Sequence, residues 1–113
     1  MVDDNSILYL YGFSTMLESN LVNLIKIIEN QIEQNSKISV VFIHDGVIGT
    51  SGVNKVSPTM KKLLNLPIAT YSLLPDLNAR GIDTAKLQNK TTGIEYSELV
   101  DLLVSIPKIV SWM

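Results

Sequence analysis

The chain has 113 residues, a formal net charge of −2 and a composition that is 46% hydrophobic. This length predicts a single domain over residues 1–113, because two domains would each be unusually small. The hydrophobic content excludes intrinsic disorder. Lys and Arg are scattered rather than clustered, so we expect no direct contact with nucleic acid, which needs a concentrated basic surface.

The sequence contains no cysteine and a single histidine. Disulfides, thiolate metal sites and thiol nucleophiles are therefore excluded for this chain, and we predict neither a metal nor a cofactor. Every aliphatic run falls far short of the roughly 18 residues needed to span a bilayer. Residues 1–5 are acidic and polar, unlike a signal peptide. We expect a cytoplasmic protein without membrane contact, whose hydrophobicity favours an oligomer.

Two strands and a helix are predicted in the first part of the chain. Residues 6–11 form an apolar, β-prone run that ends at Gly12. Residues 15–18 match a capping box, which begins an amphipathic helix that ends near Asn35. The apolar face of this helix consists of Leu17, Leu21, Leu24, Ile25, Ile28 and Ile32. Residues 37–43 are apolar enough to predict a strand buried on both faces, as in a parallel sheet.

Helices and strands continue to alternate in the middle of the chain. Residues 47–53 fit a helical turn followed by a break at Gly52. Ser57 and a proline at the first helical position predict a helix up to about Asn65. Residues 66–73 predict a third strand, with its proline at the start where a missing N–H is tolerated. Residues 75–80 predict a short helix that is closed by Gly81.

The last part of the chain predicts a weak strand over residues 91–96, then a helix capped by Ser97 that runs through Val104, and an apolar tail over residues 107–113. The alternation of strands and helices predicts a three-layer α/β fold. In such a fold a mostly parallel sheet of four to five strands is flanked by helices through right-handed crossovers.

Open parallel sheets bind ligands beyond the carboxyl ends of their strands, where residues 12–15, 44–52 and 73–76 are expected to lie. From His44 to Gly52, an imidazole, the carboxylate of Asp45 and several glycines form a candidate crevice. The alternative is a strand-ending turn, in which Asp45 caps the following amides and Gly46 takes a positive φ. The glycine spacing matches neither a P-loop nor a dinucleotide fingerprint.

Two further candidate interface sites have both a structural and a functional interpretation. Asp76 and Arg80 are four residues apart, which favours an ion pair on one helical face. Alternatively Arg80, the only arginine, anchors a partner subunit or an anion. Trp112 either packs within the domain or forms an inter-subunit contact. Because no catalytic triad, paired carboxylates or HExxH motif is present, we predict that the chain is not an enzyme.

Three motifs and the tryptophan near the end of the chain together resemble a known family. The motifs are Phe-Ile-His-Asp-Gly-Val at residues 42–47, Tyr-Ser-Leu-Leu-Pro-Asp-Leu-Asn-Ala-Arg-Gly at residues 71–81 and Ile-Glu-Tyr-Ser-Glu-Leu-Val at residues 94–100. In this order they resemble the DsrH/TusB branch of the DsrE/DsrF/DsrH superfamily. The resemblance implies a flavodoxin-like fold that assembles into dimers or hexamers. It also implies a role in sulfur transfer, either for tRNA 2-thiouridine synthesis or for dissimilatory sulfur oxidation.

The chain departs from the sulfur-carrying members of this superfamily. Their cysteine corresponds to the region of residues 21–24, where this sequence has none. The resemblance therefore implies a non-catalytic subunit that assembles with cysteine-bearing DsrE/DsrF-like (TusC/TusD-like) chains, as a homodimer or a hetero-hexamer. His44 and Asp45 would then tune a partner's thiolate, while Arg80 stabilises the persulfide or docks the next carrier. The alternative hypothesis is a homo-oligomeric module that binds a small molecule or anion in the crevice from His44 to Gly52.

Overall fold

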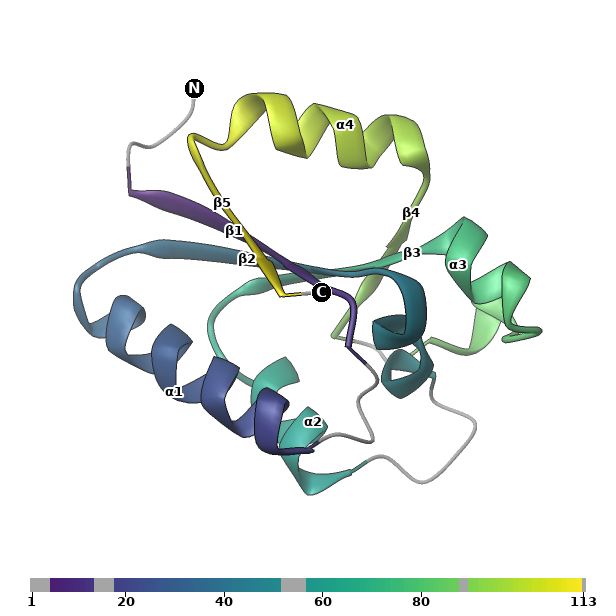
Figure 1. Ribbon diagram of the computed structural model, residues 1–113, viewed down its shortest axis with the longest axis horizontal. Helices are drawn as coiled ribbons and strands as arrows, with labels where there is room; N and C mark the ends of the chain where they lie inside the picture. The colour runs from purple at the N-terminus through teal and green to yellow at the C-terminus, as the bar shows by residue number, and fades with distance from the viewer. Residues whose placement is uncertain (1–4, 14–17, 52–56, 88–89, 113) are drawn as a thin grey trace.

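The computed structural model describes residues 5–13, 18–51, 57–87 and 90–112 (Figure 1). Its centre is a five-stranded sheet in the order β4-β3-β2-β1-β5, in which every neighbouring pair is parallel. The strands are β1 (Ser6–Tyr11), β2 (Lys37–Phe42), β3 (Ala69–Leu73), β4 (Thr92–Ile94) and β5 (Lys108–Trp112). The predicted parallel α/β architecture is confirmed.

Helices cover both faces of the sheet, as Figure 1 shows. The α-helices are α1 (Glu18–Glu33), α2 (Pro58–Leu64), α3 (Leu74–Ala79) and α4 (Tyr96–Ser105), and the 3-10 helices are η1 (His44–Thr50) and η2 (Thr84–Lys86). Helices α1 and α2 lie on one face and α4 on the other. This division follows from the strand order: β1 to β4 advance in one direction across the sheet, and the return from β4 to β5 carries α4 over the opposite face.

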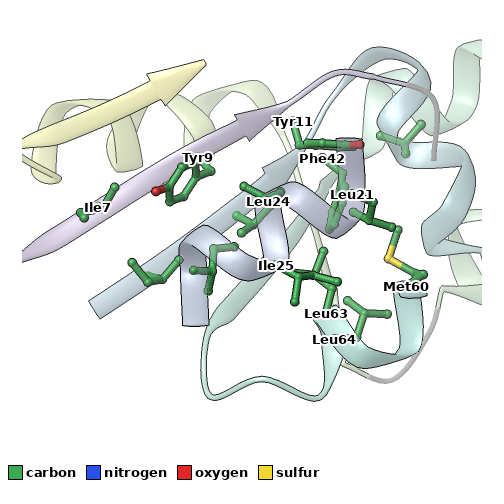
Figure 2. Close-up of a cluster of buried hydrophobic side chains, with 14 of the residues drawn as sticks. Ile7, Tyr9, Tyr11, Leu21, Leu24, Ile25, Phe42, Met60, Leu63 and Leu64 are labelled. Atoms are coloured by element: carbon green, nitrogen blue, oxygen red, sulfur yellow. The ribbon is translucent and has the colours of Figure 1, made fainter. Parts of the chain in front are cut away.

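The face under α1 and α2 holds the larger part of the core (Figure 2). Four residues of the predicted apolar face of α1 are buried: Leu21, Leu24, Ile25 and Ile28. They pack with Ile7, Tyr9 and Tyr11 of β1. Ile32 is partly buried against the same cluster, while Leu17 and the predicted capping box at 15–18 fall largely outside the described residues. The predicted amphipathic helix is confirmed over its described length.

The face under α4 is less completely covered. Its buried cluster comes from the strands and the residue after β2, namely Leu8, Val41, Ile43, Leu73 and Ile94. Helix α4 adds partly buried side chains but has no buried residue of its own. Tyr96, Val100 and Val104 of α4 are 56%, 54% and 82% exposed. Apolar surface therefore remains in contact with solvent on this side of the molecule.

Several predicted elements occur with changed boundaries. Strand β3 begins at Ala69 rather than at 66, because Pro67 lacks an N–H and the Ile68 N–H bonds to the carbonyl of Leu66, 2.8 Å away, in a tight turn. The cap of α4 is Glu95 rather than Ser97: Glu95 and Glu98 form a reciprocal capping box. Strand β4 is shorter than the predicted run of 91–96. The predicted helical turn after β2 is confirmed as η1, and Gly52 lies outside the described residues.

The predicted apolar tail at 107–113 is wrong, because residues 108–112 form β5. This strand pairs in parallel with β1, from Ile7 beside Lys108 to Tyr11 beside Trp112. The Gly12 N–H extends the pairing by donating to the Trp112 carbonyl at 2.8 Å. By contrast, two short helices are confirmed: the Ser57 hydroxyl caps α2 by accepting from the Met60 N–H, and Gly81 follows α3 with a φ of +69°.

Candidate functional site

The first part of the candidate site is formed where η1 follows β2. His44 has a φ of +50°, in the left-handed region that non-glycine residues seldom adopt. Its N–H donates to Asp76 Oδ2 over 2.7 Å, and this bond ties the first residue of η1 to α3. The turn prediction assigned the positive φ to Gly46, which is wrong: among the described glycines only Gly81 has one. The Asp76 carboxylate instead holds His44 in that conformation.

Gly46 is required for close packing rather than for its conformational freedom. A Cβ built on this residue would lie 2.3 Å from the main-chain oxygen of Tyr11, and its N–H donates to the Ile43 carbonyl at 2.9 Å. The end of β1 therefore occupies the space beside the Gly46 backbone. Val47 and Thr50 of the same helix are buried as well, so η1 packs tightly against the end of the sheet.

Arg80 connects α3 to η1. Its Nε donates to Asp45 Oδ1 over 3.0 Å, and its Nη1 donates to the main-chain oxygen of Asp76 over 3.2 Å. The predicted ion pair between the Asp76 and Arg80 side chains is wrong, because the Asp76 carboxylate accepts from His44. The prediction that Asp45 caps the following amides is also wrong, since η1 has no side-chain cap and Asp45 accepts from Arg80.

Four of the candidate residues, His44, Asp45, Asp76 and Arg80, thus meet at the carboxyl ends of β2 and β3. We call these four residues the carboxyl-end cluster. His44 and Asp45 are exposed, while Asp76 and Arg80 are half-buried. The cluster presents an imidazole and an anchored guanidinium to solvent, and both groups can bind an anion or a carboxylate.

Trp112 lies at the same end of the sheet but outside this cluster. Its ring centroid is 6.4 Å from that of Tyr11 in a tilted arrangement, and its half-buried side chain packs against the core beneath α1. The predicted packing within the domain is therefore present. The inter-subunit contact of Trp112 stays a prediction.

Sequence reasoning missed two tyrosines beneath α1. Burial raises the pKa of Tyr11, whose hydroxyl is buried without a hydrogen-bond partner. Burial also raises the pKa of Tyr9, whose hydroxyl donates a hydrogen bond to Gln31 Oε1. The alternation of β1 could have placed both rings on one face, but no local signal distinguishes the paired hydroxyl from the unpaired one.

Two properties of the described residues bear on ligands and membranes. Within residues 5–13, 18–51, 57–87 and 90–112, no three His, Cys, Asp or Glu side chains are grouped so that they could hold a metal ion. Over the same residues, no helix combines the length and the apolar character that crossing a membrane requires.

The architecture is shared with solved structures. The ychN protein from E. coli superposes with a TM-score of 0.73 and 17% identity, over 94% of this chain and 97% of that protein. A protein of unknown function from Methanobacterium thermoautotrophicum, MTH1491, superposes with a TM-score of 0.71 and 16% identity, over 94% and 96% of the two chains. At these identities the likeness establishes the class of fold alone.

The sequence comparisons establish the family. A family model described as "DsrH like protein" matches residues 14–109, and this chain belongs to that DsrH-like family. TusB from Serratia proteamaculans (strain 568) is 36% identical over 74 residues, covering 65% of this chain and 73% of the relative. TusB from Escherichia coli (strain K12 / DH10B) is 33% identical over 73 residues, with coverage of 65% and 73%. The resemblance to the DsrH/TusB branch is confirmed.

Proposed function

We propose that this chain is a non-catalytic subunit of an intracellular sulfur-relay complex, of the type that serves tRNA 2-thiouridine synthesis or sulfur oxidation. It acts as a single domain over residues 1–113 and assembles with cysteine-bearing DsrE/DsrF-like (TusC/TusD-like) chains. The observation that carries the proposal is a DsrH-like chain without any cysteine. Sulfane sulfur moves by attack of a thiolate on sulfur, so the thiolate has to come from a partner.

The carboxyl-end cluster is the surface that we assign to the shared site. A protonated imidazole at His44 would lower the pKa of a neighbouring partner thiol by favouring its thiolate form. The guanidinium of Arg80 keeps further N–H donors beyond those that bond Asp45 and the Asp76 carbonyl. These donors suit a persulfide anion or a carboxylate of the next carrier. Asp45 and Asp76 act as positioning residues, because they hold Arg80 and the backbone of His44.

Co-expression with the cysteine-bearing DsrE- and DsrF-like chains of the native host tests assembly. Native mass spectrometry should show complexes that contain this chain and at least one such relative. The control is the same experiment with a cysteine-free variant of the relative, which should still assemble but carry no sulfur. Absence of any mixed complex, with both chains folded, would contradict the proposal.

The role of Arg80 is tested by Arg80→Gln in the assembled complex. Losing a charge-assisted hydrogen bond is worth about 1.5–3 kcal/mol, so we expect sulfur transfer between partner cysteines to slow by about ten-fold or more. Lys86→Gln removes the same charge from an exposed position on η2 and should leave transfer unchanged. Equal rates for the two variants, with assembly intact in both, would remove Arg80 from the site.

The alternative function is a homo-oligomeric binding module for a small molecule or anion. A thermal-shift screen of the chain alone distinguishes it from the sulfur-relay subunit. In the crevice it would use, Gly46 is already packed against the main chain of Tyr11. We therefore expect nucleotides to leave the melting temperature unchanged. A robust shift with one nucleotide that is abolished by Arg80→Gln would favour the binding module.

A further inference from the structure

One long edge of the sheet has no neighbouring strand in the described part of the chain. Strand β5 is the last strand in the sheet order and pairs with β1 on one side only. The opposite edge, β4, has three residues, whereas β5 has five. Natural sheets usually protect such edges with charges, prolines or bulges. In β5 the only charged residue is Lys108, at the start of the strand.

The direction of the main-chain groups of β5 follows from its pairing. The Trp112 carbonyl accepts from the Gly12 N–H, so the main chain of Trp112 faces β1. The N–H and C=O of successive residues in a strand point to alternate sides. Lys108 and Val110 therefore also face β1, and the main-chain groups of Ile109 and Ser111 face outward. Two donors and two acceptors are thus spaced along the edge, symmetrically about Val110.

The side chains of β5 are apolar on both faces of the sheet. Ile109 is in register with Leu8, on the α4 face, and is 43% exposed. Val110 and Trp112 point to the other face, where they pack partly buried against the core beneath α1. An edge strand that carries half-exposed apolar side chains on both faces gains from a further strand, which would cover both sets at once.

We infer that β5 binds β5 of a second copy of this chain, in antiparallel orientation about a two-fold axis at Val110. Ile109 then lies opposite Ser111 of the second copy, and the outward groups of these residues form four main-chain hydrogen bonds. Lys108 lies opposite Trp112 of the second copy, where its ammonium can contact the indole face. The two copies of Lys108 remain about 14 Å apart along the strands, so like charges do not meet.

A second copy is the occupant that this edge favours because the edge is complementary to itself. Its outward donors and acceptors, its apolar side chains and its single charge all find partners under the same two-fold rotation, as an isologous interface requires. The carboxyl-end cluster follows β2 and β3 rather than β5, so the pairing leaves it open. The inference does not depend on the proposed sulfur-relay function.

The test is the oligomeric state of the purified chain, measured by analytical ultracentrifugation over a series of concentrations. We expect a concentration-dependent dimer. Ser111→Pro removes an outward N–H at an edge position, where proline is tolerated. Under the two-fold it deletes two of the four hydrogen bonds, so the dissociation constant should rise by about ten-fold or more. Ile109→Lys adds a charge at the same edge and should also dissociate the dimer.

Ile27→Lys is the matched control, because Ile27 lies on α1 and is 40% exposed. It should leave the dimer unchanged. Circular dichroism and melting curves show whether each variant is folded, so that loss of the dimer is not mistaken for loss of the fold. A wild-type chain that stays monomeric at every concentration overturns the inference. It is equally overturned by a dimer that survives in folded Ser111→Pro and Ile109→Lys, or by an edge that pairs only with a DsrE-like chain.

Discussion

The two faces of the sheet are covered by helices to different degrees. Beneath α1 and α2 the side chains close into one core that includes Leu21, Leu24 and Ile28, all with no exposed surface. On the opposite face the sheet is covered by α4. None of the residues of α4 is buried, and Val104 is 82% exposed. The same chain therefore completes one core by itself and leaves apolar surface on the other side.

This difference separates the residues that hold the fold from those available for assembly. Burial of an apolar side chain contributes about 1.5–3 kcal/mol, so the α1 face supplies most of the stability that packing provides. Exposed apolar side chains on α4 and β5 add little to the fold of one chain. If the proposed assembly forms, such surface is the expected place for contacts with other subunits.

Truncation in α1 gives the largest expected difference between the faces. Leu24→Ala removes a fully buried side chain from the core beneath α1 and should lower the free energy of unfolding by about 2–5 kcal/mol. Val104→Ala on α4 should change it by no more than about 0.5 kcal/mol. Urea unfolding followed by circular dichroism measures both. Similar losses for the two variants would contradict the comparison.

Disturbing the contact between η1 and β1 should lower the free energy of unfolding nearly as much as Leu24→Ala does. In Gly46→Ala the new methyl group meets the Tyr11 main-chain oxygen, so the backbone has to shift at a cost of about 1–3 kcal/mol. Gly81→Ala provides a contrast: no atom lies within 4 Å of its Cβ position, and its cost comes from a φ of +69° alone, about 1–2 kcal/mol. Unfolding of the two variants should rank Gly46→Ala as the more harmful.

The two tyrosines of β1 should respond in opposite directions to the loss of their hydroxyls. Tyr11→Phe removes a buried hydroxyl that has no partner and should stabilise the fold by about 1 kcal/mol. Tyr9→Phe removes the hydrogen bond to Gln31 and should destabilise it by a similar amount. Thermal unfolding at neutral pH measures both changes. A loss of stability in Tyr11→Phe would show that its hydroxyl has a partner in solution.

The smallest expected effect is on pH dependence. Burial raises the pKa of Tyr9 and Tyr11 above the ordinary tyrosine value of 10.0, so the folded state holds these protons more tightly than the unfolded state. Their contribution to stability is complete below pH of about 10 and is lost as the pH rises through the folded-state pKa values. The double variant Tyr9→Phe, Tyr11→Phe should flatten this decline. Tyr96→Phe, at an exposed position, should not.

The fold was predictable wherever the signal was local. The apolar spacing of α1, the capping Ser57 of α2 and the glycine after α3 each lie within a few residues of the element that they define. The carboxyl-end position of the candidate residues followed from the parallel sheet. These predictions needed no knowledge of which segments meet in space.

The errors occurred where a distant segment decides the structure. Residues 108–112 form a strand because β1 lies beside them, and nothing near them in the sequence indicates that neighbour. The spacing of Asp76 and Arg80 indicated an ion pair within α3, but that helix has only six residues. Asp45, which belongs to η1, accepts from Arg80 instead. The Asp76 carboxylate accepts from the His44 N–H.

We propose that this chain aids sulfur transfer without carrying sulfur itself. The most direct measurement is intact-mass analysis of every subunit of the assembled complex during turnover with a sulfur donor. We expect added sulfur only on cysteine-bearing partner chains, and a lower transfer rate when this chain is omitted. Sulfur bound covalently to this chain, or an unchanged rate in its absence, would contradict the claim.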